Sequence, residues 1–232
     1  MPKYQLFNGK NTEQMPLLLI EGQNPLLLLD CMKWKLEALT NEDMSTQEKE
    51  TRLNTYVDLG EGIAYHPSGN LKIVFGTPAL WSFITPKSKL SERALVLTEK
   101  EYGELSGVEL SRKEAKKYTE KWLTQEQVRN NKLWKILTHN PNEVPKEFAE
   151  ESSLLEEYTD RIFSEAKKRY TYNENMGIFF LGSVQEQPTL RLWFVGGLDC
   201  RSGVSGIGGL LSRHGCFVGY TEGAMQKNNE NK

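Results

Sequence analysis

Residue types that carry chemistry are scarce in this sequence. It has three cysteines and three histidines among 232 residues, and it has no Cys-x-x-Cys pair. So few cysteines, in odd number, exclude a disulfide framework and indicate reduced thiols, although one bond between Cys200 and Cys216 stays open. His66, His139 and His214 are far apart, and a zinc site needs three or four converging ligands. We therefore expect no metal and no cofactor.

Long hydrophobic runs are absent as well. The apolar runs 17–20 and 26–29 are split by polar residues and proline. Each is far shorter than the roughly 20 apolar residues that cross a bilayer. The basic start, unbroken apolar stretch and small-residue cleavage site of a signal peptide are also missing. The sequence thus predicts a soluble, cytoplasmic protein with no membrane partner.

The overall charge balance points to no particular partner. The formal net charge is −2, with 38% hydrophobic and 26% charged residues. These values are ordinary for a globular protein and give no global attraction to nucleic acid. The length suits a single domain over 1–225 followed by a disordered polar tail over 226–232. A weak boundary near 86–91 is the alternative.

Helix starts are predicted where Ser or Thr is followed three residues later by Glu or Gln, which is the capping-box pattern. The positions that fit are Ser45, Thr98, Ser111, Thr124 and Ser153. The helix after Ser153 is the most regular, with one apolar face extending to residue 170. Asn24-Pro25 predicts a further helix start, with Asn24 as the N-cap and the helix ending near residue 39.

Strands are predicted toward both ends of the sequence. The run 17–20 fits a short buried strand. A Pro-Ser-Gly turn at 67–69 predicts a hairpin between 63–66 and 71–75, and a second hairpin is expected between 177–181 and 189–195. The run 216–220 fits a last strand. We therefore expect an α+β fold, mainly an antiparallel sheet built from N- and C-terminal hairpins and packed against a central group of helices.

One segment is unusually rich in glycine. Nine of the nineteen glycines lie between 196 and 223. Successive amides in such a loop can form an anion-binding nest, and arginine suits phosphate or carboxylate. The anion-binding candidates are Arg201, Ser202, Gly203, Ser205, Gly206, Gly208, Gly209 and Arg213. No Walker A or dinucleotide pattern is present. The alternative is that these glycines only serve turns and bulges.

The same segment allows a thiol-chemistry hypothesis. Asp199, Cys200, His214 and Cys216 are close in sequence. A nucleophilic cysteine needs an oriented base, and a histidine with an aspartate would serve. Packed, unreactive thiols are the alternative, because closeness in sequence does not place side chains together.

A basic stretch with interleaved aromatic residues lies between 111 and 135. It has eight basic and three acidic residues, and Ala115, Tyr118 and Trp122 follow helical spacing. Such a helix can bind a phosphate backbone and stack on bases. The nucleic-acid candidates are Lys117, Lys121, Trp122 and Lys132. The stretch 142–165 has eight acidic and two basic residues, so pairing of solvated helix faces is the alternative.

Three classes of function stay open. The first is a non-catalytic soluble binding protein for an anionic small molecule or nucleic acid, through 196–223 or the basic stretch 111–135. The second is an enzyme that uses the glycine-rich loop as an anion cradle, with Cys200 or His214 in the chemistry. The third is a protein–protein interaction protein without a small-molecule site, which requires a large exposed apolar patch. Association between copies of the chain is also open. The first class is favoured, because two segments offer anion-binding chemistry and no general base is evident.

Overall fold

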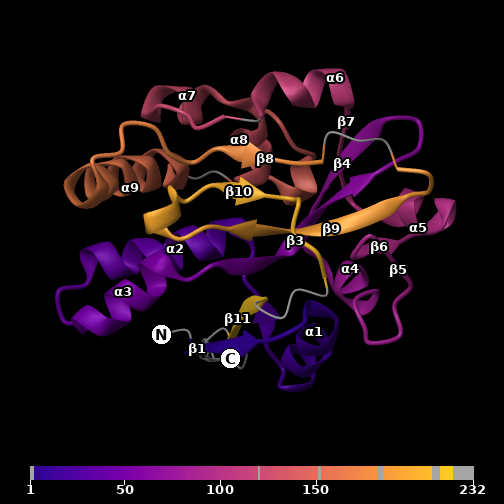
Figure 1. Cartoon of the computed structure of the whole chain (residues 1–232), viewed down its shortest axis with the longest axis horizontal. Helices are drawn as coiled ribbons and strands as arrows, with labels where there is room; N and C mark the ends of the chain where they lie inside the picture. Colours follow the sequence, from indigo (N-terminus) through magenta and orange to yellow (C-terminus); the bar gives the residue numbers. More distant parts are fainter. Residues whose placement is uncertain (1–2, 120, 151–152, 182–184, 211–214, 222–232) are drawn as a thin grey trace, which may run out of the picture.

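One sheet holds the molecule together in the computed structural model, which describes residues 3–119, 121–150, 153–181, 185–210 and 215–221. Its main path follows the order β1-β11-β3-β9-β10-β8 (Figure 1). These strands are β1 (Lys3–Asn8), β11 (Cys216–Thr221), β3 (Val57–Tyr65), β9 (Thr189–Val195), β10 (Val204–Ser205) and β8 (Ile178–Phe179). β11 lies between β1 and β3, antiparallel to the first and parallel to the second. Strands from the two ends of the sequence, β1 and β11, therefore pair at one end of this path.

Five further strands pair with strands of this path or with each other. They are β2 (Asn24–Pro25), β4 (Asn70–Val74), β5 (Leu90–Ser91), β6 (Ala94–Val96) and β7 (Gly107–Ser111). β4 pairs with β3 and β7, β6 pairs with β9 and β5, and β2 pairs with β11. The sheet is mainly antiparallel, as expected.

Helices surround the sheet on several sides (Figure 1). The α-helices are α1 (Asn11–Ile20), α2 (Leu28–Thr40), α3 (Thr46–Asn54), α4 (Pro78–Ser82), α5 (Glu99–Glu104), α6 (Arg112–Ala115), α7 (Gln125–Asn130), α8 (Lys132–Leu137) and α9 (Leu154–Tyr170). The 3-10 turns are η1 (Lys116–Tyr118), η2 (Lys146–Phe148) and η3 (Leu198–Cys200). Of the helices described, none combines the length and the apolar character needed to cross a membrane.

The capping signals predict most helix starts correctly. The side chains of Ser45, Thr98, Ser111 and Thr124 each accept a hydrogen bond from the backbone amide three residues on. Reciprocal capping boxes form at Thr98 and Thr124. Ser153 precedes α9 as predicted, but it makes no side-chain cap bond among the described residues. The apolar face of α9 is buried, so this helix is held by packing as well as by local signals.

Two predictions near the N-terminal part of the sequence are wrong. Residues 17–20 end helix α1 rather than forming a strand, because a short apolar run fits either element. Asn24-Pro25 forms strand β2 beside β11, and the helix begins at Leu28. The Leu28 amide donates to the Glu61 carboxylate at 2.8 Å. This cap comes from 33 residues away, so no local pattern announces it.

The two predicted hairpins have different outcomes. β3 and β4 pair antiparallel around Gly69, whose φ of 91° is the left-handed conformation that the turn requires. The second hairpin is wrong. β8 pairs with β10 in parallel, and β10 pairs with β9 on its other side. β10, which follows β9 in the chain, thus lies between β8 and β9, where the predicted hairpin would have paired these two strands directly.

A buried ionisable pair crosses the core between β3 and the loop after α8. The Glu61 carboxylate lies 2.9 Å from His139 Nε2, and His139 Nδ1 lies 2.9 Å from the Phe148 carbonyl oxygen. Glu61 is 2% exposed and His139 6%. Burial opposes protonation of His139, but the Glu61 carboxylate and the Phe148 carbonyl outweigh it and raise its pKa above 6.5. One carboxylate therefore serves a helix start and a buried histidine.

Candidate functional site

The glycine-rich segment leaves β9, turns through η3 and returns as β10. In Figure 1 the η3 turn lies between α9 and α3, and it contacts both helices. The Gly196 amide donates to Gly203 O at 2.8 Å, the Val204 amide to Gly177 O at 2.8 Å, and the Gly206 amide to Phe179 O at 2.8 Å. These N–H groups are used within the chain, so they are not free to face an anion.

Close packing explains why glycine is needed at Gly203 and Gly206. A Cβ at Gly206 would lie 2.4 Å from Ile63 Cγ2 and 2.9 Å from the Trp193 ring. A Cβ at Gly203 would lie 2.8 Å from the Trp122 ring. The alternative use of glycine, where backbone passes close to other groups, therefore accounts for these two positions.

The predicted anion-binding residues differ in how far they are exposed. Ser202, Gly203, Ser205 and Gly206 are buried. Arg201 is half-buried at the end of η3. Gly208 is half-buried beside Phe194, and Gly209 is half-buried beside Arg93. Arg213 and His214 lie outside the described residues.

Two buried cations hold the part of the glycine-rich segment that extends from residue 196 to residue 208. Lys35 on α2 is 0% exposed and donates to the carbonyl oxygens of Leu53 (3.1 Å), Thr55 (3.2 Å) and Gly196 (3.4 Å). Burial lowers the pKa of Lys35, since it disfavours the charged form. Nothing in the local sequence distinguishes this lysine from a surface lysine.

Arg191 on β9 holds the backbone at residues 207 and 208 in the same way. It is 5% exposed and donates to the carbonyl oxygens of Ile207 (2.9 Å), Gly208 (3.2 Å) and Glu92 (2.7 Å). The segment from 196 to 208 is therefore fixed at its first residue by Lys35 and at its last two by Arg191.

Aromatic side chains gather where this segment meets the surface. A cavity of about 400 Å³ is lined by Tyr56, Trp122, Tyr172, Phe179, Phe194, Gly196, Asp199, Cys200, Arg201, Gly203, Ser205 and Ile207. A second cavity of about 610 Å³ is lined by Tyr56, Asp58, Arg93, Phe194, Ser205, Ile207, Gly208, Gly209 and Gly215. The two share Tyr56, Phe194, Ser205 and Ile207, so they form one surface. We call it the aromatic groove.

The rings of the aromatic groove come from separate parts of the sequence. Tyr56 precedes β3 and contacts Phe194 of β9, with ring centroids 6.3 Å apart. Trp122 meets Phe179 of β8 edge-on at 5.0 Å. Tyr56 is 43% exposed, while Trp122, Phe179 and Phe194 are half-buried. The groove thus offers a large apolar surface that is partly open to solvent and whose rings are held in place by packing against one another.

Arg201 enters the groove beside two of these rings. Its guanidinium carbon lies 4.4 Å from the Tyr172 ring centroid and 5.6 Å from that of Trp122. Its Nη1 donates to the Glu174 carbonyl oxygen at 3.4 Å. Of the two arginines predicted to bind an anion, Arg201 lines the groove and Arg213 lies outside the described residues.

The cysteines give limited support to thiol chemistry. Cys31, Cys200 and Cys216 are all free, so the disulfide left open between Cys200 and Cys216 is not formed. Burial raises the pKa of the Cys31 and Cys216 thiols to about 11. Cys200 is exposed in the groove, where its hydrogen bond to Tyr56, together with burial, raises the pKa of that tyrosine to about 12. The base predicted for Cys200, His214, lies outside the described residues.

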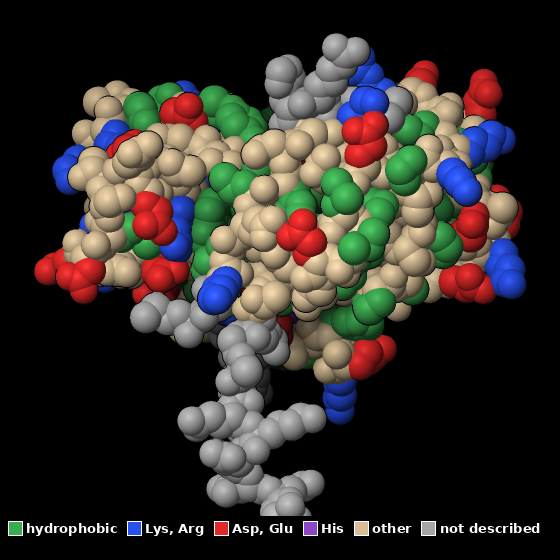
Figure 2. Space-filling view, turned by 90° about the horizontal axis from the view of Figure 1, so that it is seen from below, with side chains coloured by type: hydrophobic (Ala, Val, Ile, Leu, Met, Phe, Trp, Pro, Cys, Tyr) green, Lys and Arg blue, Asp and Glu red, His purple; other side chains and the backbone are tan. Residues whose placement is uncertain are grey.

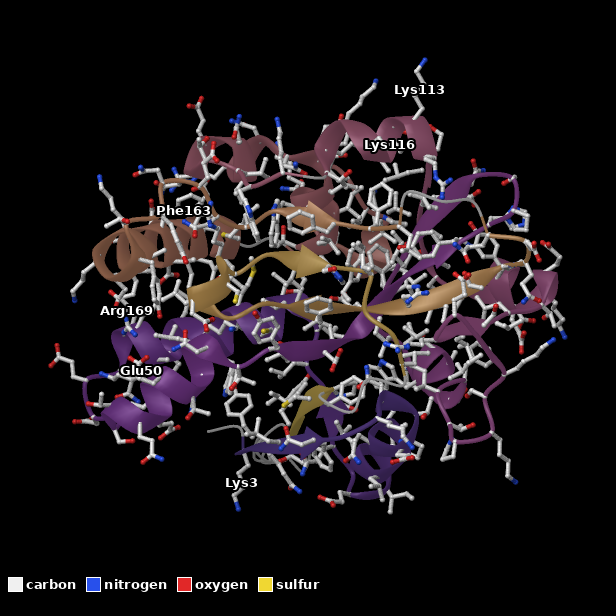
Figure 3. The ribbon with its side chains drawn as sticks, in the orientation of Figure 1. Lys3, Glu50, Lys113, Lys116, Phe163 and Arg169 are labelled. Carbon is white, nitrogen blue, oxygen red and sulfur yellow. The ribbon has the colours of Figure 1, made fainter. Side chains whose placement is uncertain are left out.

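The basic stretch is not one helix. α6 ends at Ala115 and a 3-10 turn follows, so Tyr118 and Trp122 do not share a helical face. Figure 3 shows Lys113 and Lys116 pointing away from the molecule. Lys117 and Lys121 are exposed, and Lys132 pairs with Glu114 at 2.6 Å. Of the four nucleic-acid candidates, Trp122 alone lines the groove as described.

Charged helix faces also pair with each other elsewhere. This agrees with the alternative given above for the charged stretches, in which solvated helix faces pair. Arg129 of α7 pairs with Asp160 of α9 at 2.6 Å. In Figure 3, Arg169 of α9 and Glu50 of α3 face each other, and they form an ion pair. These pairs lie at the helix surfaces rather than in the aromatic groove.

Another surface, on β1 and α1, carries exposed apolar side chains. Leu6 on β1 is 42% exposed, and Leu17 and Ile20 on α1 are 48% and 81% exposed. Figure 2, seen from below, shows hydrophobic side chains there in small groups between polar and charged ones. Ile20 therefore provides a control position away from the groove.

Asp58, which lines the second cavity, makes the stability of the fold depend on pH. Its carboxylate accepts from the Cys216 amide at 2.8 Å, and burial raises its pKa from 3.8 to about 6. Between these values the folded chain binds more protons than the unfolded chain, so stability falls as pH rises from about 4 to 6. Asp58→Asn removes this dependence. We expect the variant to gain on the order of 2 kcal/mol relative to wild type across that interval. Urea unfolding of both proteins at pH 4, 5, 6 and 7 measures this gain. The prediction would be contradicted if the difference in free energy of unfolding between wild type and variant were the same at every pH.

Comparison with known proteins shows the fold. No protein-family description and no curated protein matches the sequence. The chain is similar to a solved structure described as "Accommodation of massive sequence variation in Nanoarchaeota by the C-type lectin fold", with a TM-score of 0.60 and 16% sequence identity. The similarity covers 95% of this chain and 98% of that chain. At this identity it shows the C-type lectin fold alone.

Proposed function

We propose that the protein is a non-catalytic binding protein whose ligand occupies the aromatic groove. The observation that carries the proposal is the convergence of Tyr56, Trp122, Tyr172, Phe179 and Phe194 beside the glycine-rich segment. Large, partly exposed rings in a concave site supply much of the binding energy in protein recognition. A fixed backbone below them keeps the ordering cost of binding low.

The groove also modifies the anion-binding hypothesis. The amides of Gly196, Val204 and Gly206 are bonded within the chain, so side chains rather than backbone would contact a ligand. Arg201 then supplies the positive charge. Support for catalysis is weaker, because no described histidine lines either cavity.

The fold similarity is compatible with this division of roles. The Nanoarchaeota structure is described as a C-type lectin fold that accommodates massive sequence variation. In the present chain, Lys35 and Arg191 hold the backbone from inside, while the groove side chains face outward. The outward side chains can thus set the choice of ligand without rebuilding the frame.

Replacing Trp122 with alanine tests the proposal. The full chain is used to select binders from a pool of random peptides and a pool of single-stranded oligonucleotides. For binders held in the groove we expect Trp122→Ala to weaken binding about 30-fold, as loss of a central aromatic residue does. Isothermal titration calorimetry measures the affinities.

Ile20→Ala is the matched control, because Ile20 is a large exposed apolar residue on α1, outside the groove. It should change the affinity less than twofold. Thermal unfolding confirms that both variants are folded. If no selected binder depended on Trp122, the groove would not be the binding site.

A further inference from the structure

Arg201 has hydrogen-bonding capacity that the described chain leaves unused. A guanidinium carries five N–H donors. Among the described residues it has one acceptor, the Glu174 carbonyl oxygen at 3.4 Å, and no carboxylate within ion-pair distance. Arg129, Arg169 and Lys132 each have an acidic partner. An arginine that lies in a groove without an acidic partner can donate its remaining N–H groups to an acidic group of a ligand.

The orientation of Arg201 is set before any ligand arrives. Its guanidinium lies over the Tyr172 ring at 4.4 Å and near Trp122 at 5.6 Å. Stacking on aromatic faces limits the rotamers of a long side chain and fixes the plane of its donor fork. A planar fork with free N–H groups matches the two oxygens of a carboxylate.

The shape of the groove favours an elongated occupant. Two cavities of about 400 and 610 Å³ share the wall formed by Tyr56 and Phe194. β10 already has a strand partner on each side, so a bound chain cannot extend the sheet there by pairing with it. Along β10, recognition would therefore run through side chains.

The charges of the groove favour protein over nucleic acid. Its lining has Arg201 and Arg93 as cations and Asp58 and Asp199 as acids. A surface that binds a phosphate backbone needs several unopposed cations. Tyrosine, tryptophan, phenylalanine and arginine are instead the residues enriched where proteins bind each other.

We infer that the aromatic groove takes an extended segment of a partner protein, with an apolar side chain among the rings and an aspartate or glutamate bound to Arg201. The inference rests on the proposed function and adds the chemistry of the ligand. Two recognition elements at neighbouring positions would give the groove both affinity and selectivity, since a carboxylate without an apolar neighbour would gain little from the rings.

A charge-matched comparison tests the inference. Peptides selected on the full chain should combine an apolar residue with a nearby Asp or Glu. For such a peptide we expect Arg201→Gln to reduce affinity about tenfold, which corresponds to about 1.4 kcal/mol. Changing the peptide acid to its amide should have the same effect on wild type and almost none on the variant. Lys121→Gln, which removes an exposed cation beside Trp122, should change affinity less than twofold.

Different failures have different meanings. If Trp122→Ala abolished binding while Arg201→Gln did not, or if selected peptides lacked acids, the carboxylate contact would be wrong and the groove would stand. If Lys121→Gln matched Arg201→Gln, general electrostatic attraction would replace a specific contact. If Trp122→Ala had no effect, both proposals would fall. Oligonucleotides that bind more tightly than any peptide would also overturn the inference.

Discussion

Replacing Lys35 with alanine is expected to lower the free energy of unfolding by about 3–5 kcal/mol. The side chain is fully buried, so removal of its three outer methylenes and its ammonium group leaves a cavity. The carbonyl oxygens of Leu53, Thr55 and Gly196 also lose their donor inside the protein. Urea unfolding at neutral pH measures the loss.

Lys35→Met separates packing from hydrogen bonding. Methionine fills most of the space but donates nothing, so about half of the loss should remain. In both variants, amide hydrogen exchange should quicken at Gly196 and Val204, because the start of the glycine-rich segment is released. A Lys35→Met protein as stable as wild type would show that the cost of burying the ammonium equals the benefit of its three bonds.

Replacing Glu61 with leucine is expected to destabilise the protein by a similar amount, about 3–5 kcal/mol. The change leaves His139 Nε2 and the Leu28 amide without their shared partner in a region closed to water. Because the pKa of His139 is raised in the folded state, its contribution to stability is fully present below pH 6.5 and is lost as pH rises through the folded value. The gap between wild type and variant should therefore be widest at low pH. Urea unfolding from pH 5 to 8 measures this.

Glu61→Gln is the informative control. The amide oxygen can still accept from Leu28, but the negative charge beside His139 is gone. We expect an intermediate loss of stability and a much weaker pH dependence. If Glu61→Leu unfolded with less than 1 kcal/mol of change, water or a rearranged side chain would have to satisfy His139 and Leu28.

Local signals explain which parts of the fold the sequence could predict. Ser45, Thr98 and Thr124 cap helices by hydrogen bonds to amides only three residues further along the sequence. Gly69 determines a turn of four residues. Such contacts are visible in a single stretch of sequence. The start of α2 depends on Glu61, and strand β2 depends on β11, so both were missed.

The candidate site shows the same limit. The glycine-rich segment stood out through composition, and Arg201 and Trp122 were named for their chemistry. Their joint place in a groove was not predicted, because Tyr56, Tyr172 and Phe194 come from distant elements and carry no shared motif. The roles of Lys35 and Arg191 were missed for another reason: only burial distinguishes them from surface cations.

The position of β11 between β1 and β3 affects the order in which the sheet can form during synthesis. β11 spans Cys216–Thr221 and contacts β1, β2 and β3, which precede it by more than 150 residues. Until residue 221 leaves the ribosome, β1 has no strand partner among the described residues, and β3 lacks its partner at Asp58, beside the stretch Gly62–Tyr65 that β4 covers. Contacts this far apart in sequence slow folding. The nascent chain therefore exposes two unpaired strand edges for most of its synthesis, and its sheet closes only when the last strand arrives.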